Sequence, residues 1–261
     1  MRPLRSSVVA SRPVDSTDAD LTDGRFVLRP ATRVDLPAMS RAHIDLLPMG
    51  LFPALGPRFL QRWQRTFLES PHGVGIVAVD TTTRPGEVVG LVLGATDHHA
   101  HTAELARNRR ALASLALAGC LALTVRPRVA VRTARSRLRP LARRLLRIGV
   151  FPATAERAAS VAAPNVAVMS VLAVRPQWRR SGIGVLLVAH FVEQARLAGA
   201  TRVEAQTSTG SVGATGFYER LGWEAGAQES TPDGESVRTY HHRLEPPDRA
   251  IADGEMTGRS H

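Results

Sequence analysis

Short apolar runs, bounded by glycine, proline or acidic residues, set the hydrophobic pattern of this chain. Most are rich in valine and isoleucine, and runs of this length and composition predict β-strands. They begin at Phe26 and recur at 75–80, 88–94, 166–174 and 203–208. The Pro85-Gly86 pair between two of them predicts the turn of a hairpin.

Helices are predicted between these strands. The pattern predicts helices over 39–47, 58–68 and 183–199, and Asp35, with Pro37 in the first turn, marks the start of the first one. Strands that alternate with helices favour an α/β fold. With 261 residues and 44% apolar content, the chain can bury one substantial core.

We expect one folded domain over 25–245. The segments 1–24 and 246–261 are rich in polar residues and proline, a composition typical of disordered tails. The first of them carries arginines but no continuous apolar run of the length that a signal peptide needs, so we expect no such peptide.

A long insertion separates the third strand from the fourth, at about 98–164. Its alanine, leucine and arginine content predicts helices at 102–123 and 135–148. Within it, Ala111 to Val125 has almost no polar residue, but these 15 residues fall short of the ~20 needed to span a bilayer. Three alternatives stay open for this stretch: a buried helix, an element lying on an anionic membrane, or a partner interface.

The positive charge of the chain belongs to this insertion. The formal net charge is +11, and 12 arginines but no acidic residue lie between Leu105 and Val150. The segment 105–150 therefore offers a peripheral contact with an anionic membrane. No aromatic platform or recognition motif accompanies the arginines, which argues against a nucleic-acid partner.

Cys120 is the one cysteine of the chain. A single cysteine excludes a disulfide framework and fits a reducing cytoplasm. Because its neighbours are leucine, alanine and glycine, we expect a buried, inert thiol.

The segment with the clearest chemistry follows the strand at 166–174. It reads Arg179-Arg180-Ser181-Gly182-Ile183-Gly184 and opens a helix. A glycine loop at a helix N-terminus presents unpaired N–H groups and partial positive charge to an anion, which suits a diphosphate. A Walker loop is excluded because the chain has no lysine, and a dinucleotide fingerprint because only G-x-G is present.

A second motif lies about 30 residues further on. It reads Ser211-Val-Gly-Ala-Thr-Gly-Phe-Tyr-Glu-Arg-Leu-Gly-Trp223. Together the two segments resemble the coenzyme A loop and the N-x-x-A-x-x-F-Y-x-x-x-G-[FW] motif of the GNAT acetyltransferase superfamily. The resemblance is firm over Val166 to Trp223. It implies the GNAT fold, an α/β (α+β) architecture with a mixed sheet of about six to seven strands flanked by helices, here with a helical insertion between the third and fourth core strands.

The resemblance also implies a binding mode for acetyl-CoA. The pantetheine arm would add to the strand edge at Leu172, Ala173 and Val174, and the diphosphate would bind the loop over 179–184. A bulge around 170–172 would leave an N–H free to polarise the thioester carbonyl. Ser211 stands where the family usually has a cofactor-binding asparagine, and serine can still donate a hydrogen bond.

Two residues are candidates for catalysis. Tyr218 matches the position that protonates the departing thiolate in many relatives. The alternative is that Tyr218 only packs in the core. Glu204 could deprotonate the amine or could be a solvated strand residue. Further candidates for the base follow the third strand: Asp97, His98, His99 and His101. We expect no metal, because this histidine cluster has no second set of ligands.

The resulting prediction is an N-acetyltransferase of the class EC 2.3.1 that moves an acetyl group from acetyl-CoA to a primary amine by direct attack. The acceptor would be a small molecule or a peptide. The alternative is a GNAT-fold protein that binds acyl-CoA without turnover, as a sensor or a membrane- or partner-docking protein. We expect the insertion to cover the acceptor side of the cleft next to Tyr218.

Overall fold

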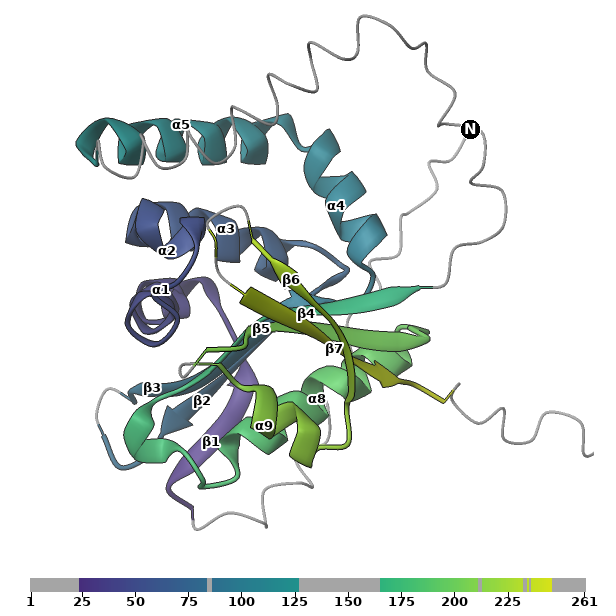
Figure 1. Cartoon of the computed structure of the whole chain (residues 1–261). Helices are drawn as coiled ribbons and strands as arrows, with labels where there is room; N and C mark the ends of the chain where they lie inside the picture. Colours follow the sequence, from purple (N-terminus) through teal and green to yellow (C-terminus); the bar gives the residue numbers. More distant parts are fainter. Residues whose placement is uncertain are drawn as a thin grey trace, which may run out of the picture.

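A seven-stranded mixed sheet forms the centre of the molecule (Figure 1). The computed structural model describes residues 24–83, 86–126, 165–210, 213–231, 234 and 236–245. The strand order is β1-β2-β3-β4-β5-β7-β6, and β4–β5 is the parallel pair among antiparallel ones. The strands are β1 Phe26–Pro30, β2 Gly73–Asp80, β3 Val88–Ala95, β4 Val166–Val174, β5 Arg202–Ser208, β6 Glu224–Ser230 and β7 Ser236–Arg243. The expected mixed sheet is confirmed.

Several sequence-based expectations fall on residues that lie outside the described ranges. They are the helix at 135–148, residue Ser211 and nearly all of the two expected tails.

Two helices cover one face of the sheet. They are α8 (Ile183–Leu197) and α9 (Thr215–Arg220), drawn below the sheet in Figure 1. Residues of α8 spaced by about one helical turn are buried against β2, β3 and β4: Ile183, Leu187, Val188, Phe191 and Ala195. This apolar stripe fixes α8 on the sheet and so fixes where its N-terminus points.

The opposite face is covered by α1 (Leu36–Leu46), α2 (Leu51–Leu55) and α3 (Pro57–Glu69). A capping box precedes α1, because Thr32 N and Oγ1 both donate to Asp35 Oδ2 at 2.8 Å. Asp35 also binds Arg29 through two hydrogen bonds, and this pairing lowers the pKa of Asp35 to about 2. The start of the first helix was therefore predicted correctly. Asp35 contributes to it as part of the capping box that precedes α1.

The insertion begins with two helices, α4 (His98–Arg107) and α5 (Arg109–Val125). The sequence predicted one helix here, but Asn108 separates them, because its side chain caps α5 by accepting from Ala111 N. In the part of the chain that the structure describes, no helix is long and apolar enough to cross a membrane.

The structure rules out one of the three alternatives for α5 and contradicts the expectation for Cys120. Of its residues only Ala118 is buried, so the stretch 111–125 is not a buried helix. Cys120 is exposed, not buried. The reason is that α5 packs on α2 and α3 through one side alone, with Leu115, Ala118 and Ala122 against Phe59, while its other side faces solvent.

The expected position of the insertion is also wrong for these two helices. α5 contacts α3 and α2, and α4 contacts β4 and α5. They lie on the α1–α3 face, above the sheet in Figure 1, whereas Tyr218 lies in the core between the sheet and α8. α4 and α5 therefore do not cover the cleft next to Tyr218.

Candidate cofactor and catalytic site

Strands β4 and β5 separate halfway along their length. Their pairing runs from Val166–Arg202 to Met169–Ala205 and ends there, although β4 continues to Val174 and β5 to Ser208. We call the region between 170–174 and 206–208 the β4–β5 split. Along it, β4 keeps its hydrogen bonds to β3 but presents a free edge toward β5. A free strand edge can bind an extended, amide-containing chain by strand addition.

The split starts at a β-bulge. Leu93 of β3 pairs with Val171, and Gly94 pairs with Met169, so Ser170 has no partner on β3. Gly94 lies opposite this bulge, and a Cβ there would be 2.3 Å from the carbonyl oxygen of Val168 and 2.8 Å from the Phe191 ring. A glycine is therefore needed for β3, β4 and α8 to meet this closely.

The bulge reverses which side chains of β4 face each layer. Before it, Ala167 and Met169 pack in the core under α8. After it, Val171 and Ala173 pack in the core under α1 and α3, while Leu172 and Val174 turn toward α8. A bulge in this position agrees with the expectation from the sequence and re-aims the backbone of 170–174 into the split.

The loop over 179–184 leads from β4 into α8. Arg180 has φ of +67° and Gly182 of +87°, so the backbone turns through two left-handed residues before the helix. Leu186 N donates to Gly182 O at 3.0 Å, which makes Gly182 the N-cap. The N–H groups of the first helical turn have no carbonyl partner within the helix.

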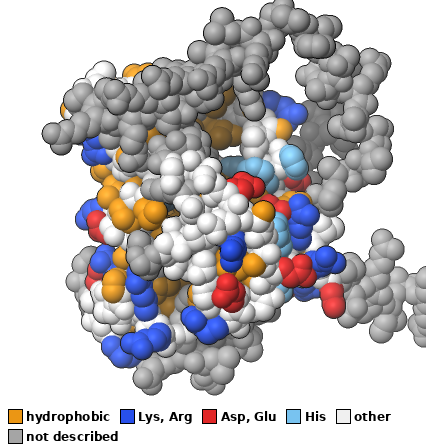
Figure 2. All heavy atoms as spheres, in the orientation of Figure 1, with side chains coloured by type: hydrophobic (Ala, Val, Ile, Leu, Met, Phe, Trp, Pro, Cys, Tyr) orange, Lys and Arg blue, Asp and Glu red, His pale blue; other side chains and the backbone are white. Residues whose placement is uncertain are grey.

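Other contacts anchor this loop to the end of β4. Arg179 Nε donates to Val174 O at 3.3 Å, and Ser181 Oγ donates to Trp178 O at 2.6 Å. The Arg180 side chain is exposed and has no partner among the described residues. Figure 2 shows basic side chains gathered at the lower end of the molecule, where β4 runs into α8. The loop thus joins free N–H groups to positive charge, as a diphosphate requires.

α9 lies against both the loop and the split. Its N-terminus is held at the end of β5, where Ala214 N donates to Thr207 Oγ1 at 2.9 Å. The Phe217 ring lies so close to Gly184 that a Cβ there would be 3.4 Å from it. Phe217 therefore packs against the first turn of α8, and the next residue, Tyr218, enters the core beside it.

Tyr218 is 4% exposed and stacks on Tyr240, with ring centroids 5.3 Å apart. It shares its core with Leu172 and Val174 of the split. Burial raises the pKa of Tyr218, so its hydroxyl keeps its proton at neutral pH. Among the described residues, no group bonds to that hydroxyl, whereas the Tyr240 hydroxyl donates to Glu219 at 2.9 Å.

Glu204 lies on β5, one residue before the strands separate. Val203 and Ala205 are buried under α8, so Glu204 points to the other face of the sheet. Its carboxylate pairs with Arg202 at 2.8 Å and lies 3.5 Å from Nδ1 of His241 on β7. His241 was missed in the sequence, because its contact with Glu204 depends on the pairing of β5 with β7.

The other candidates for the base lie elsewhere. Asp97 caps α4 by accepting from Ala100 N, and the His101 ring stacks on Phe67 at 4.5 Å. His98 and His99 follow Asp97 in the first turn of α4. These residues build the start of the insertion and are not brought to the split. Among the described residues no three His, Cys, Asp or Glu side chains form a group that could hold a metal ion.

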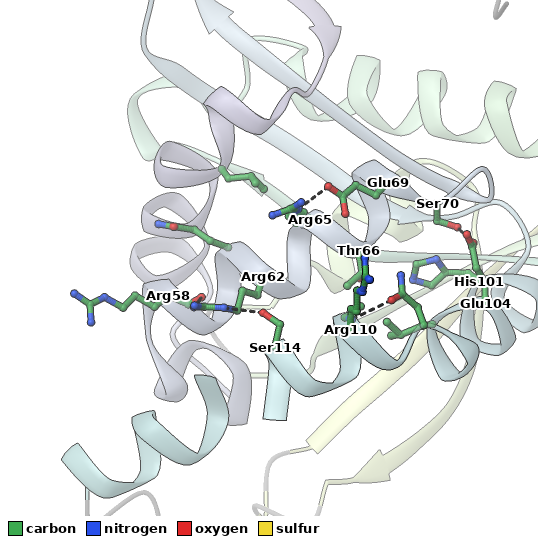
Figure 3. Close-up of a pocket in the computed structure, with 15 residues that line it drawn as sticks. Arg58, Arg62, Arg65, Thr66, Glu69, Ser70, His101, Glu104, Arg110 and Ser114 are labelled. Carbon is green, nitrogen blue, oxygen red and sulfur yellow. Dashed lines mark hydrogen bonds and ion pairs between the residues drawn. The ribbon is translucent and has the colours of Figure 1, made fainter. Parts of the chain in front are cut away.

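A groove of about 800 Å³ lies away from the split, between α3 and the insertion (Figure 3). One wall is the polar side of α3 and the other is formed by α4 and the start of α5. It is thus a feature of the insertion and not of the candidate cofactor site.

Comparison with known proteins agrees with this geometry. The sequence profile of the acetyltransferase (GNAT) family matches residues 47–223. The chain belongs to this family. The matched range contains the β4 bulge, the loop over 179–184 and Tyr218. A search of curated protein sequences gives no match.

Solved structures of acetyltransferases have the same fold. The complex of Arabidopsis thaliana NAA60 with a bisubstrate analogue is 13% identical, over 84% of this chain and 99% of that chain, with a TM-score of 0.51. Ard1 from Thermoplasma volcanium is 16% identical over 85% and 99%, with a TM-score of 0.49. The ribosomal-protein-S18-alanine N-acetyltransferase of Escherichia coli is 11% identical over 87% and 98%, with a TM-score of 0.48. The expected GNAT fold is confirmed, and identities this low say nothing of the acceptor.

Proposed function

We propose that this protein is an N-acetyltransferase that moves an acetyl group from acetyl-CoA to a primary amine by direct attack on the thioester. The observation that carries the proposal is the coincidence of three features: the β4 bulge, the free β4 edge and the α8 N-terminus with its glycine loop. The family supplies the reaction class.

The residues present fit acetyl-CoA. Leu172, Ala173 and Val174 offer main-chain groups along the split, and the loop from Arg179 to Gly184 offers N–H groups and two guanidinium groups. Ser211 is proposed as a further contact. When bound, acetyl-CoA supplies an activated acetyl thioester. The bulge at Ser170 would leave a main-chain N–H free to polarise the thioester carbonyl.

Tyr218 is proposed as the general acid. Its hydroxyl is protonated at neutral pH, as a proton donor must be, and Phe217 already provides the packing against α8. Glu204 is proposed as the base that takes the proton of the amine, with His241 beside it as a second acceptor. The ion pair between Glu204 and Arg202 must open for this role.

The decisive test uses the two tyrosines of the chain. Turnover would be measured with acetyl-CoA and a panel of small-molecule and peptide amines, by titrating the free thiol that is released. We expect Tyr218→Phe to lower turnover by about 10²–10⁴-fold while acetyl-CoA affinity stays nearly constant. Tyr240→Phe is the matched control, because it removes a buried hydroxyl from the stacked neighbour, and it should retain activity.

Two outcomes would contradict the assignment. A fully active Tyr218→Phe enzyme would remove the tyrosine from proton transfer. Tight binding of acetyl-CoA without turnover on any amine would favour the alternative, a non-catalytic acyl-CoA-binding protein. The existing pairing of Glu204 with Arg202 is the observation that keeps this alternative open.

We also propose a cytoplasmic location with peripheral membrane contact. The single cysteine suits a reducing compartment, and the basic segment 105–150 suits an anionic membrane surface. Cell fractionation with and without a high-salt wash checks both parts, because a peripheral, charge-dependent contact is released by salt.

A further inference from the structure

One side of α5 combines charge with exposed apolar side chains. The residues at this side follow a helical spacing of three or four: Arg110, Ser114, Leu117, Leu121 and Val125. Leu117, Leu121 and Val125 are 60%, 57% and 77% exposed. Single exposed leucines are ordinary, but three successive turns of one helix side without a charge form a continuous stripe.

At the start of α5 the stripe reaches the groove between α3 and the insertion. Arg110 and Ser114 of α5 line this groove, and Arg58 and Arg62 of α3 line it from the other side (Figure 3). Arg62 donates to Ser114 Oγ at 3.0 Å, so the two walls meet where the apolar stripe begins. The exposed apolar stripe and the cationic groove are therefore parts of one surface.

Three arginines of the groove are not neutralised by a carboxylate of the described residues. Its two carboxylates are already engaged, because Glu69 pairs with Arg65 at 2.5 Å and Glu104 accepts from Ser70. Among the described residues, Arg58, Arg62 and Arg110 have no carboxylate partner. His101, 5% exposed, also lines the groove, and its Nδ1 makes no hydrogen bond within the described part of the chain. An anion with hydrogen-bonding oxygens would satisfy these groups.

The charged residues of α5, and the one that follows its end, are all basic. Arg109 and Arg110 lie at the start of α5 and Arg126 follows its end. From Leu105 to Val150 the sequence contains no acidic residue. A second copy of the chain would bring these arginines against each other, and a nucleic acid would leave the leucines in water. An anionic bilayer matches both parts, because lipid headgroups carry phosphate directly above an apolar layer.

We propose that this surface binds an anionic phospholipid bilayer. Leu117, Leu121 and Val125 enter the interfacial layer, and Arg58, Arg62 and Arg110 bind headgroup phosphate in and beside the groove. The bound membrane would lie on the α3–α5 side of the sheet, which leaves the β4–β5 split and the α8 N-terminus accessible. This inference deepens the peripheral membrane contact proposed above by naming its surface, and it involves none of the residues of the proposed acetyl transfer.

Vesicle flotation of the full chain tests the apolar part. We expect the protein to float with vesicles of phosphatidylcholine and phosphatidylserine and to stay behind with phosphatidylcholine alone. The double variant Leu117→Glu, Leu121→Glu should partition more than about tenfold less, because two carboxylates replace inserted side chains. Leu197→Glu is the matched control, since Leu197 is 61% exposed on α8, and it should float like the wild type.

A second pair of variants tests the cationic part. We expect Arg58→Gln, Arg62→Gln to weaken vesicle binding by about fivefold for each arginine at moderate salt, and the difference should shrink at high salt. Arg243→Gln, at an exposed arginine on the far strand β7, should have no such effect. Inorganic phosphate at millimolar concentration should not release the protein, because it supplies no apolar layer.

Each variant counts as folded when its acetyl-CoA affinity and the midpoint of its thermal unfolding equal those of the wild type. Equal flotation of the wild type and the leucine double variant would overturn the proposal. So would a wild-type dimer in light scattering that the leucine variant dissociates, because the stripe would then be an interface between copies. Binding of inorganic phosphate to the groove without any vesicle binding would also overturn it, leaving a site for a soluble anion.

Discussion

The helices α8 and α5 are similar in composition and opposite in environment. Both are about four turns long and built mainly of apolar residues. α8 buries Ile183, Leu187 and Phe191 completely against the sheet. α5 buries one alanine and exposes leucines. The first presents its N-terminus to the β4–β5 split, whereas the second lies on the outside of α3.

The difference comes from which side of each helix carries the large residues. In α8 most of them share the side toward the sheet, whereas Glu193 is exposed. In α5 the large residues are divided between the two sides: Leu115 packs beside Ala118 on the contact side, whereas Leu117 and Leu121 are exposed. One exposed leucine is ordinary, but a continuous stripe of large apolar side chains along the outer side of a helix indicates a binding surface.

The largest effect is expected where α8 begins. Gly184→Asp should weaken acetyl-CoA binding by more than about 100-fold, because it places a carboxylate at the proposed site of the diphosphate and like charges so close cost several kcal/mol. Calorimetric titration of the variant with acetyl-CoA measures this.

Two controls define that result. Gly184→Asn adds the same volume near Phe217 without the charge and should lose much less affinity. Ala113→Asp, on the exposed side of α5, should leave acetyl-CoA binding unchanged. If the asparagine variant were as weak as the aspartate variant, volume and not charge would explain the loss.

The next effect concerns stability. Phe191→Ala in α8 should lower the free energy of unfolding by about 3–5 kcal/mol, because a fully buried ring leaves a cavity. Leu121→Ala in α5 should change it by less than about 0.5 kcal/mol, because that side chain is exposed. Urea unfolding of both variants gives the comparison, and a large loss in Leu121→Ala would mean that the outer side of α5 is covered in the folded chain.

A smaller, pH-dependent effect on stability is expected at His43, a buried residue of α1 on the face of the sheet opposite α8. Burial lowers the pKa of His43 from 6.5 to about 4, and its Nδ1 has no hydrogen bond within the described residues. The unfolded chain therefore binds a proton below pH 6.5 that the folded one does not bind until about pH 4. The stability that this group contributes is complete above pH 6.5 and is lost as the pH drops. Around pH 5 the free energy of unfolding should fall by about 1 kcal/mol per pH unit, close to the value for the binding of one proton.

His43→Phe should remove this part of the pH dependence. Phenylalanine keeps the ring contact with Trp63, whose centroid lies 5.9 Å from that of His43. Urea midpoints of both proteins from pH 8 to pH 4.5 measure the difference, which should grow as the pH falls. If the urea midpoints of the two proteins differed by the same amount at every pH, His43 would bind its proton in the folded state at the same pH as in the unfolded chain.

The local structure of the candidate cofactor site could be predicted from the sequence because its residues are neighbours along the chain. The glycines and arginines of 179–184 are adjacent along the chain, and a strand before them with a helix after them fixes their geometry. The bulge at Ser170 was expected from the family resemblance alone, and the pairing of β3 with β4 confirms it.

What could not be predicted depends on contacts between distant residues. The side of α5 that is buried is decided by Phe59 and Leu55, some 60 residues earlier in the chain, and no periodicity within 111–125 reveals them. The contact between Glu204 and His241 arises from strand register, which a single strand does not specify. The sequence therefore left a buried α5 open as one alternative, wrongly predicted a buried Cys120 and missed His241.

The smallest effect is expected at Cys120, which was wrongly predicted to be buried. Cys120 lies on the exposed side of α5, so Cys120→Ser should change the free energy of unfolding by less than about 0.5 kcal/mol, since no buried contact is lost. In the native protein its thiol should react completely with a water-soluble thiol reagent without denaturant. A thiol that reacts only after urea is added would mean that another part of the chain covers this side of α5, and the leucine stripe beside it would then already have its partner.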